Sequence, residues 1–352
     1  STWIIVKVAD VFGARLNEGW FKGGFSVDKY ALNYYRPPGY KQVEWSFPVS
    51  YKSLNWTHPV EETKALMKLI DEWKPTHIYS LHNSGFTGTY YYITRTLEKE
   101  KMDILKSMPR RLRVPLHRGE PETPYMKKLD EAIFKMPSIA EYYDWLEKHL
   151  DKDPASIIEH GGSSYDYAVR INPEVFELVC EVPYIYDYKL GVELPIGIPR
   201  RDILEIAINR RETSIEDIEG AMRKVDSYMS SDNPFYEALT YFIRVERNNI
   251  VAMKSWAEKE SELGESATVA QAFNSYLNTI WSSILRWGLL WRSIDYEEGK
   301  RGALESLGDV KQKARDMISR EIFELNKISE YYIIPIRNTV SIQISAIIAT
   351  LI

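Results

Sequence analysis

The spacing of apolar residues changes near residue 200, and this change constrains the fold more than any other feature of the sequence. Before it, short apolar runs such as residues 78–81 and 175–182 have the length of buried strands. After it, apolar residues recur every three or four positions, which is typical of amphipathic helices. Glycine and proline punctuate residues 191–201 without any period. We therefore expect an α/β domain over residues 1–195 and a helical domain over residues 196–352.

The first domain is expected to hold a mixed, mostly parallel sheet flanked by helices. Its predicted strands are residues 3–8, 78–81, 90–93 and 175–182. Its predicted helices are residues 59–73, 95–107, 124–135 and 138–150, with an irregular loop over residues 16–40. In the second domain, apolar stripes over residues 268–294 and 304–328 predict antiparallel helices, Thr213-Ser-Ile-Glu216 predicts a helix start, and residues 333–352 predict a buried helix with one polar face.

Composition excludes several classes of protein. The 352 residues are 44% hydrophobic and 27% charged with a formal net charge of -5, which is ordinary for a globular protein and too acidic for a nucleic-acid-binding surface. No charge-free apolar run is long enough to span a membrane, so we expect no membrane partner. A single cysteine, Cys180, excludes an internal disulfide framework and a thiolate metal cage. It suits a reducing compartment, and we expect a cytoplasmic location.

His82 and Asn83 stand where the predicted strand at residues 78–81 ends and a loop with Gly85 and Gly88 begins. Ligands of α/β proteins bind at such carboxyl ends of strands. Imidazole is also a common nitrogen ligand for zinc. The alternative is a structural histidine whose ring nitrogens make hydrogen bonds within the protein.

Three stretches, taken in order, resemble the zinc carboxypeptidase (metallocarboxypeptidase) family. They are Asp10-Val-Phe-Gly13 with Asn17 and Trp20, then Phe47-Pro48 with the acidic helix start at Glu61 and the strand ending at Leu81-His82, and then Gly161-Gly-Ser-Ser-Tyr-Asp166 with the strand ending at Glu181. The resemblance covers about residues 1–190, and the helical remainder lies outside it.

The resemblance implies a zinc-dependent hydrolase that cleaves peptide or amide bonds. His82 matches a zinc ligand of the family, so Zn²⁺ is the implied cofactor, with a bound water activated for attack. Glu181 matches the general base that takes the water proton and returns it to the leaving amine. The alternative for Glu181 is an ordinary salt-bridge partner at a strand end. If the implied roles hold, His82 and Glu181 face one cleft, within the roughly 12 Å that a one-water relay allows.

The chain departs from the family in its remaining zinc ligands. The family's His-x-x-Glu pair is expected ahead of the Asp10 turn, so we expect the natural protein to have a segment upstream of Ser1 that carries it. Two similar patterns, His58-Pro-Val-Glu61 and His117-Arg-Gly-Glu120, stand at positions that do not match the family order. We interpret both as chance patterns.

The substrate-binding residues also differ. Glu44 and Trp45 stand where the family has an Asn-Arg pair that binds a substrate carboxylate. This change favours an amidated, amine-bearing or neutral substrate end, on which Trp45 could stack. The alternative is a shifted loop in which Arg36 supplies the guanidinium and Glu44 faces solvent. Tyr165, beside the Gly161 turn, and Asn83 complete the candidate substrate-binding residues.

Three interpretations follow for the whole chain. The first is a zinc-dependent hydrolase that acts on a peptide or an amide small molecule. The second, from another class, is a metal-free binding protein that keeps the fold and has lost the chemistry. The third keeps zinc and changes the substrate, as Glu44 and Trp45 suggest. The helical domain caps the site, forms a homo-oligomer or stiffens the fold, and its sequence does not distinguish these roles.

Overall fold

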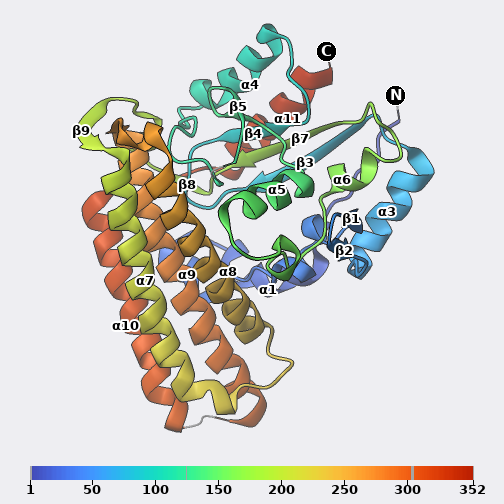
Figure 1. Cartoon of the computed structure of the whole chain (residues 1–352). Coiled ribbons are helices and arrows are strands. Elements are labelled where there is room, and N and C mark those ends of the chain that lie inside the picture. The colour runs from blue at the N-terminus through green and yellow to red at the C-terminus, as the bar shows by residue number, and fades with distance from the viewer. Residues whose placement is uncertain (1, 124, 303–304, 352) are drawn as a thin grey trace.

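The computed structural model describes residues 2–123, 125–302 and 305–351 and is built around a five-stranded sheet (Figure 1). The strand order is β3 (His77–Asn83), β7 (Phe176–Val182), β4 (Tyr90–Ile93), β6 (Ile133–Lys135) and β5 (Lys128–Asp130). β3 pairs with β7, and β4 with β6, in parallel, whereas β4–β7 and β5–β6 are antiparallel. The mixed sheet predicted from the sequence is confirmed. It is not mostly parallel, because parallel and antiparallel pairs alternate.

The two faces of this sheet have different chemistry. Phe176, Leu178 and Cys180 of β7 point to one face, where α4 (Lys99–Arg111) and α11 (Ile336–Leu351) cover them with apolar side chains. Because side chains alternate along a strand, Glu177 and Glu181 point to the other face. The sheet therefore has one apolar face and one face that carries buried carboxyl groups.

Short helices and a small hairpin surround the polar face. They are α1 (Val11–Phe21), α2 (Val27–Asn33), α3 (Glu61–Trp73), α5 (Ile139–His149), α6 (Ser164–Ala168), and the hairpin of β1 (Val49–Tyr51) and β2 (Leu54–Trp56). Asp10 begins α1 by accepting a hydrogen bond from the Gly13 N–H at 2.7 Å. A bridge between Phe47 and Gly162 ties the loop before β1 to the glycine turn before α6.

Four long helices form a bundle beside the sheet, at the lower left of Figure 1. They are α7 (Arg200–Val225), α8 (Pro234–Lys259), α9 (Val269–Arg301) and α10 (Glu305–Ile328). Ile280, Ile284 and Trp287 of α9 are fully buried in its core. α2 packs closely on α9, because a Cβ added at Gly288 would lie 2.1 Å from the Ala31 carbonyl oxygen. Two short antiparallel sheets lie at the ends of the bundle segments. One pairs β9 (Pro195–Pro199) with β10 (Ser266–Thr268), and the other pairs β8 (Ile185–Tyr186) with β11 (Tyr332–Ile333).

The predicted strands 78–81, 90–93 and 175–182 and the predicted helices 59–73, 138–150 and 268–294 are confirmed to within a few residues. Residues 3–8 are not a strand; they are irregular and exposed, with Ile5 79% exposed. Part of the loop predicted over residues 16–40 is the helices α1 and α2. Residues 213–216 lie inside α7 and start no helix.

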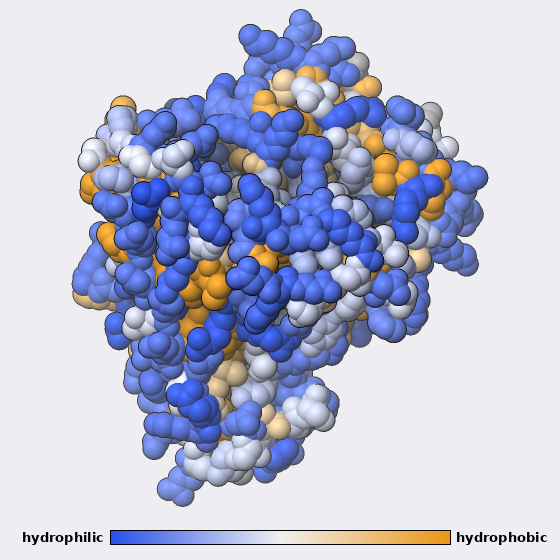
Figure 2. Space-filling view, viewed as in Figure 1, coloured by the Kyte–Doolittle hydropathy of each residue, from blue (hydrophilic) through white to orange (hydrophobic). Residues whose placement is uncertain are grey.

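The predicted helix over residues 124–135 is instead the β5–β6 pair, and residue 124 lies outside the described residues, as does Leu304 of the second stripe. The predicted terminal helix is confirmed as α11, which packs on α4 and β7. The prediction that its exposed face is polar is wrong, because Val340, Ile344 and Ile348 are exposed whereas Gln343 and Thr350 are buried. No helix among the described residues is long and apolar enough to cross a membrane. Figure 2 shows a mostly hydrophilic face with apolar residues visible among the helices of the bundle.

Candidate functional site

His82 and Glu181 lie side by side on the polar face of the sheet. β3 and β7 are parallel neighbours, and their register pairs His82 directly with Glu181. The imidazole Nδ1 lies 3.7 Å from the Glu181 Oε1. The predicted closeness of His82 and Glu181 is confirmed, and the cleft that they are expected to share stays a prediction.

The surroundings of this pair shift both groups toward their neutral forms. Burial raises the pKa of the Glu181 carboxyl well above its usual value, the nearby Glu122 raises it further, and Arg36 opposes the shift. Burial also lowers the pKa of His82, a change that Glu44 opposes and Arg36 reinforces. Burial thus favours an uncharged imidazole beside a protonated carboxyl group.

Arg36 and Glu44 both reach this site electrostatically. The Arg36 guanidinium donates to the Gln42 Oε1 from Nη2 at 3.1 Å, and the Gln42 amide donates to the Pro37 carbonyl oxygen at 2.8 Å. These contacts hold Arg36 where it lowers the pKa of Glu181. Glu44 is partly buried and also acts on that pKa, so it does not simply face solvent. The charges of both residues therefore act on the pair, and which of the two would meet a substrate stays a prediction.

The other three predicted substrate-binding residues have contacts elsewhere. The Asn83 amide donates to the Val182 carbonyl oxygen at 3.1 Å, and Asn83 follows His82 in β3, so its side chain points away from the polar face. Trp45 packs edge-on against His160, with ring centroids 5.5 Å apart, and its carbonyl oxygen accepts from the Gly161 N–H. Tyr165, on α6, packs against the core around Val179. None of these contacts joins the three residues to the His82–Glu181 pair.

The two additional His-x-x-Glu patterns do not form metal sites in this structure. His58 is exposed, with its ring edge-on to Trp56. His117 is buried, and its Nε2 lies 2.9 Å from the Glu120 carbonyl oxygen, while its Nδ1 lies 3.4 Å from the Gly88 N–H. Glu120 itself binds the Arg200 guanidinium. Both patterns therefore have structural explanations.

Sequence reasoning missed Glu122 and the two tyrosines that bind it. Tyr90 and Tyr92 of β4 lie on the polar face, and their hydroxyl groups donate to the Glu122 carboxylate, at 2.7 Å from Tyr92. Glu122 also acts on the pKa values of Glu181 and His82. The aromatic run 90–93 indicated the strand β4. No spacing in the sequence indicates that Glu122, which lies in a loop, would contact Tyr90 and Tyr92 of that strand.

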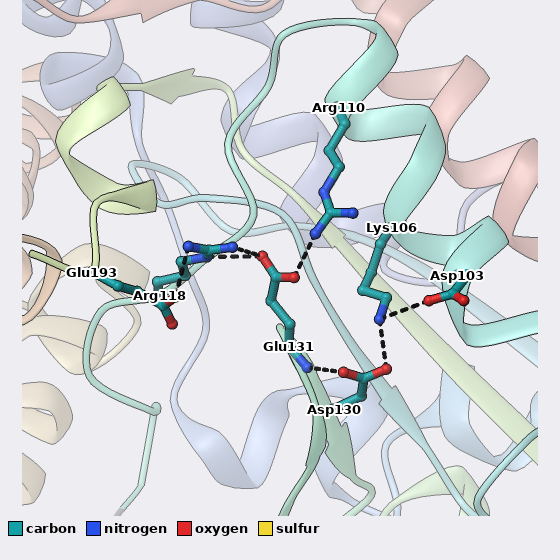
Figure 3. A network of polar contacts seen from close by, with 7 residues as sticks. All are labelled: Asp103, Lys106, Arg110, Arg118, Asp130, Glu131 and Glu193. Atoms are coloured by element: carbon teal, nitrogen blue, oxygen red, sulfur yellow. Dashed lines mark hydrogen bonds and ion pairs between the residues drawn. The ribbon is translucent and has the colours of Figure 1, made fainter. Parts of the chain in front are cut away.

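A charged network holds the loop that carries Glu122 (Figure 3). Arg118 donates to Glu131 through Nε at 2.8 Å and to Glu193 through Nη1 at 2.7 Å. Arg110 of α4 binds the other oxygen of Glu131, and Lys106 of α4 binds Asp130 at 2.6 Å. These contacts fix the β5–β6 pair and the segment after Leu116 against α4. They position the loop without belonging to the polar face.

The residues of the site do not by themselves fit a catalytic zinc ion. Such an ion uses three protein ligands and keeps one position for water. His82 and Glu181 supply two donors, and the described residues contain no group of three or more His, Cys, Asp or Glu side chains placed to hold a metal. Comparison with protein-family models, curated proteins and solved structures found no match to the chain.

Proposed function

We propose that the chain hydrolyses peptide or amide bonds at the His82–Glu181 pair. The observation that supports this proposal is the 3.7 Å separation of a histidine and a buried carboxyl group at the carboxyl ends of neighbouring strands. Two titratable groups whose surroundings shift their pKa values in opposite directions are typical of acid–base sites. The resemblance of residues 1–190 to the zinc carboxypeptidases favours the same class of reaction.

The residues of the pair can move the protons that hydrolysis requires. A neutral His82 takes a proton from water as the water oxygen attacks the carbonyl carbon. The protonated Glu181 donates its proton to the leaving nitrogen as the C–N bond breaks. The proton on His82 then passes to Glu181, which restores both groups. Arg36, always cationic, stabilises the negative charge that forms on the carbonyl oxygen.

Zinc enters this proposal only through the resemblance. The implied ion would use His82 as a ligand and would supply an activated water, with Glu181 as its base. Because the described residues supply too few ligands, metal content has to be measured together with activity. One zinc ion per chain that is lost in His82→Ala would support the family's chemistry. Hydrolysis by a metal-free protein would support the pair acting alone.

A second candidate function is metal-free binding of a peptide or amide. It is favoured by the observation that, among the described residues, no group of three metal-binding side chains forms at the site. The experiment that separates it from hydrolysis incubates the protein with a panel of peptides and small amides and measures both cleavage and binding. Glu181→Gln should reduce cleavage by about 100-fold or more if the residue is catalytic. Binding with no cleavage, unchanged in Glu181→Gln, would establish the second function instead.

A further inference from the structure

A cavity lies between the polar face of the sheet and the helical bundle. Its volume is about 280 Å³. The sheet side supplies Tyr90, Tyr92 and Phe134, and the bundle supplies residues of α7, α8 and α9, among them Leu204, Trp256 and Ser275. Tyr90 pairs with Glu181 in the register of β4 and β7, so one residue that lines the cavity is the strand neighbour of Glu181, although Glu181 and His82 do not line it themselves. The helical bundle is therefore one wall of a binding space.

The sheet wall carries the carboxylate of Glu122, an exposed residue within the electrostatic reach of Arg36. Glu122 lines the cavity and accepts hydrogen bonds from the Tyr90 and Tyr92 hydroxyl groups. No Lys, Arg or His among the described residues forms an ion pair with it, whereas Glu120, which also lines the cavity, is paired with Arg200. The two hydroxyl groups orient the Glu122 carboxylate without neutralising it. A cation is the ligand that this wall would stabilise.

The helical wall is apolar on α8 and at the start of α7 and polar on α9. Leu204, Met253 and Trp256 line it, and the Arg211 guanidinium that reaches it lies 3.4 Å from Glu246. This pairing leaves little net positive charge to attract an anion. Ser275 is buried, and its hydroxyl has no hydrogen-bond partner among the described residues. The wall can thus receive an apolar group, and it also offers polar atoms of Ser275, Asn274 and Asn278 and the Arg211 Nε, which likewise lacks a partner among the described residues.

We infer that this cavity binds a compact organic cation with an apolar body, and that the cation is the amine-bearing part of the substrate. A volume of about 280 Å³ is near the lower limit of roughly 300 Å³ for small-molecule sites, which suits a compact ligand. The ammonium group would lie at Glu122, with the aromatic rings of Tyr90, Tyr92 and Phe134 around it. The apolar body would lie against the bundle. The statement that this ligand is substrate rests on the proposed function, while binding of the cation does not.

The test compares three probes of similar size by isothermal titration calorimetry on the full chain. They are 2-phenylethylamine, the neutral 2-phenylethanol and the anionic phenylacetate. The amine should bind about tenfold or more tightly than the alcohol, because a charge-assisted hydrogen bond is stronger than a neutral one. Phenylacetate should bind most weakly. Equal binding of the three, a preference for phenylacetate, or no binding of the amine would overturn the inference.

Variants locate the site. Glu122→Gln should abolish the preference for the amine, and Glu205→Gln, an exposed position on α7 next to Leu204, is the matched control that should retain it. Leu204→Trp fills the helical wall and should weaken the amine and the alcohol alike. If Glu122→Gln does not fold, Tyr92→Phe, which removes one hydroxyl that orients Glu122, should reduce the preference. An unchanged preference in both Glu122→Gln and Tyr92→Phe would contradict the assignment.

The probes contain no amide bond, so this experiment is independent of hydrolysis. Binding with the expected preference but no cleavage of amine-bearing amides would reject the proposed function and leave the cavity assignment intact. Cleavage of amides without a preference for amine-bearing ones would leave the proposed function intact and reject the cavity assignment.

Discussion

The two faces of the central sheet come from alternate residues of the same strands, yet one face is packed by apolar side chains and the other carries buried carboxyl groups. On the apolar face, α4 and α11 bury Leu178 and Cys180 completely. On the polar face, Glu177 and Glu181 are buried four residues apart on one strand. Burial raises the pKa of both, but Glu177 is bound by the Ser164 hydroxyl at 2.7 Å, whereas Glu181 lies 3.7 Å from His82 and within the electrostatic reach of Arg36. A buried carboxyl group is thus a candidate site only where other functional groups converge on it.

The largest expected effect on stability comes from the apolar face. Leu178→Ala removes a fully buried side chain between β7 and the covering helices and should lower the free energy of unfolding by about 3 kcal/mol. Glu181→Gln, on the polar face, removes a group with a raised pKa and should leave stability unchanged or higher at pH 8. Denaturant titration of both variants measures the contrast. Equal losses in the two variants would contradict the described difference between the faces.

Glu177 provides a pH-dependent test of the polar face. Burial raises its pKa to about 7, so the folded protein binds this proton more tightly than the unfolded chain does. The stabilisation that the bound proton of Glu177 gives the folded protein is complete below the pKa that Glu177 has in the unfolded chain. The free energy of unfolding then falls as the pH rises toward 7. Glu177→Gln should remove this dependence and gain up to about 3 kcal/mol at pH 8, from the relation between a pKa shift and free energy. The measurement is the free energy of unfolding at pH 4.5 and at pH 8. An equal change between these two pH values in the wild type and in Glu177→Gln would refute the raised pKa of Glu177.

The smallest effects come from two tyrosines of β4 that point to opposite faces. The Tyr91 hydroxyl donates to the buried Leu105 carbonyl oxygen at 2.8 Å, so Tyr91→Phe should cost about 1 to 1.5 kcal/mol by leaving that oxygen unpaired. The Tyr92 hydroxyl donates to the exposed Glu122, which water can solvate, and Tyr92→Phe should cost about 0.5 kcal/mol. Thermal unfolding measures both. The reverse order would show that the polar face contributes more to stability than described.

Patterns local to the sequence predicted the strands and helices that surround the His82–Glu181 pair. The apolar run ending at His82 and the apolar stripe of α9 each have a pattern that predicts a strand or a helix from the segment alone. The segments that pack against them did not have to be known. Residues 3–8 have the composition of a strand, but a strand also needs a neighbour, and these residues pair with none of the described strands. The residues after 124 have helix-forming side chains, and their pairing with β4 decided against the helix.

The site was predicted where it depends on strand ends and missed where it depends on loops. Two parallel strands in register explain why His82 and Glu181 meet. Glu122 and Arg36 reach the same place from loops whose paths depend on distant contacts, such as the Arg118 network. Asn83 was assigned to the site from its position beside His82, and the alternation of a strand turns it to the other face.

The most direct test of the central claim measures amide hydrolysis by His82→Ala, Glu181→Gln and the double variant, using the best substrate from the panel. If the two residues act as one acid–base unit, each single variant should lose about 100-fold or more in kcat, and the double variant should lose little more than either. Folding is checked by thermal unfolding of each variant. Losses that multiply in the double variant, or full activity in either single variant, would contradict the account.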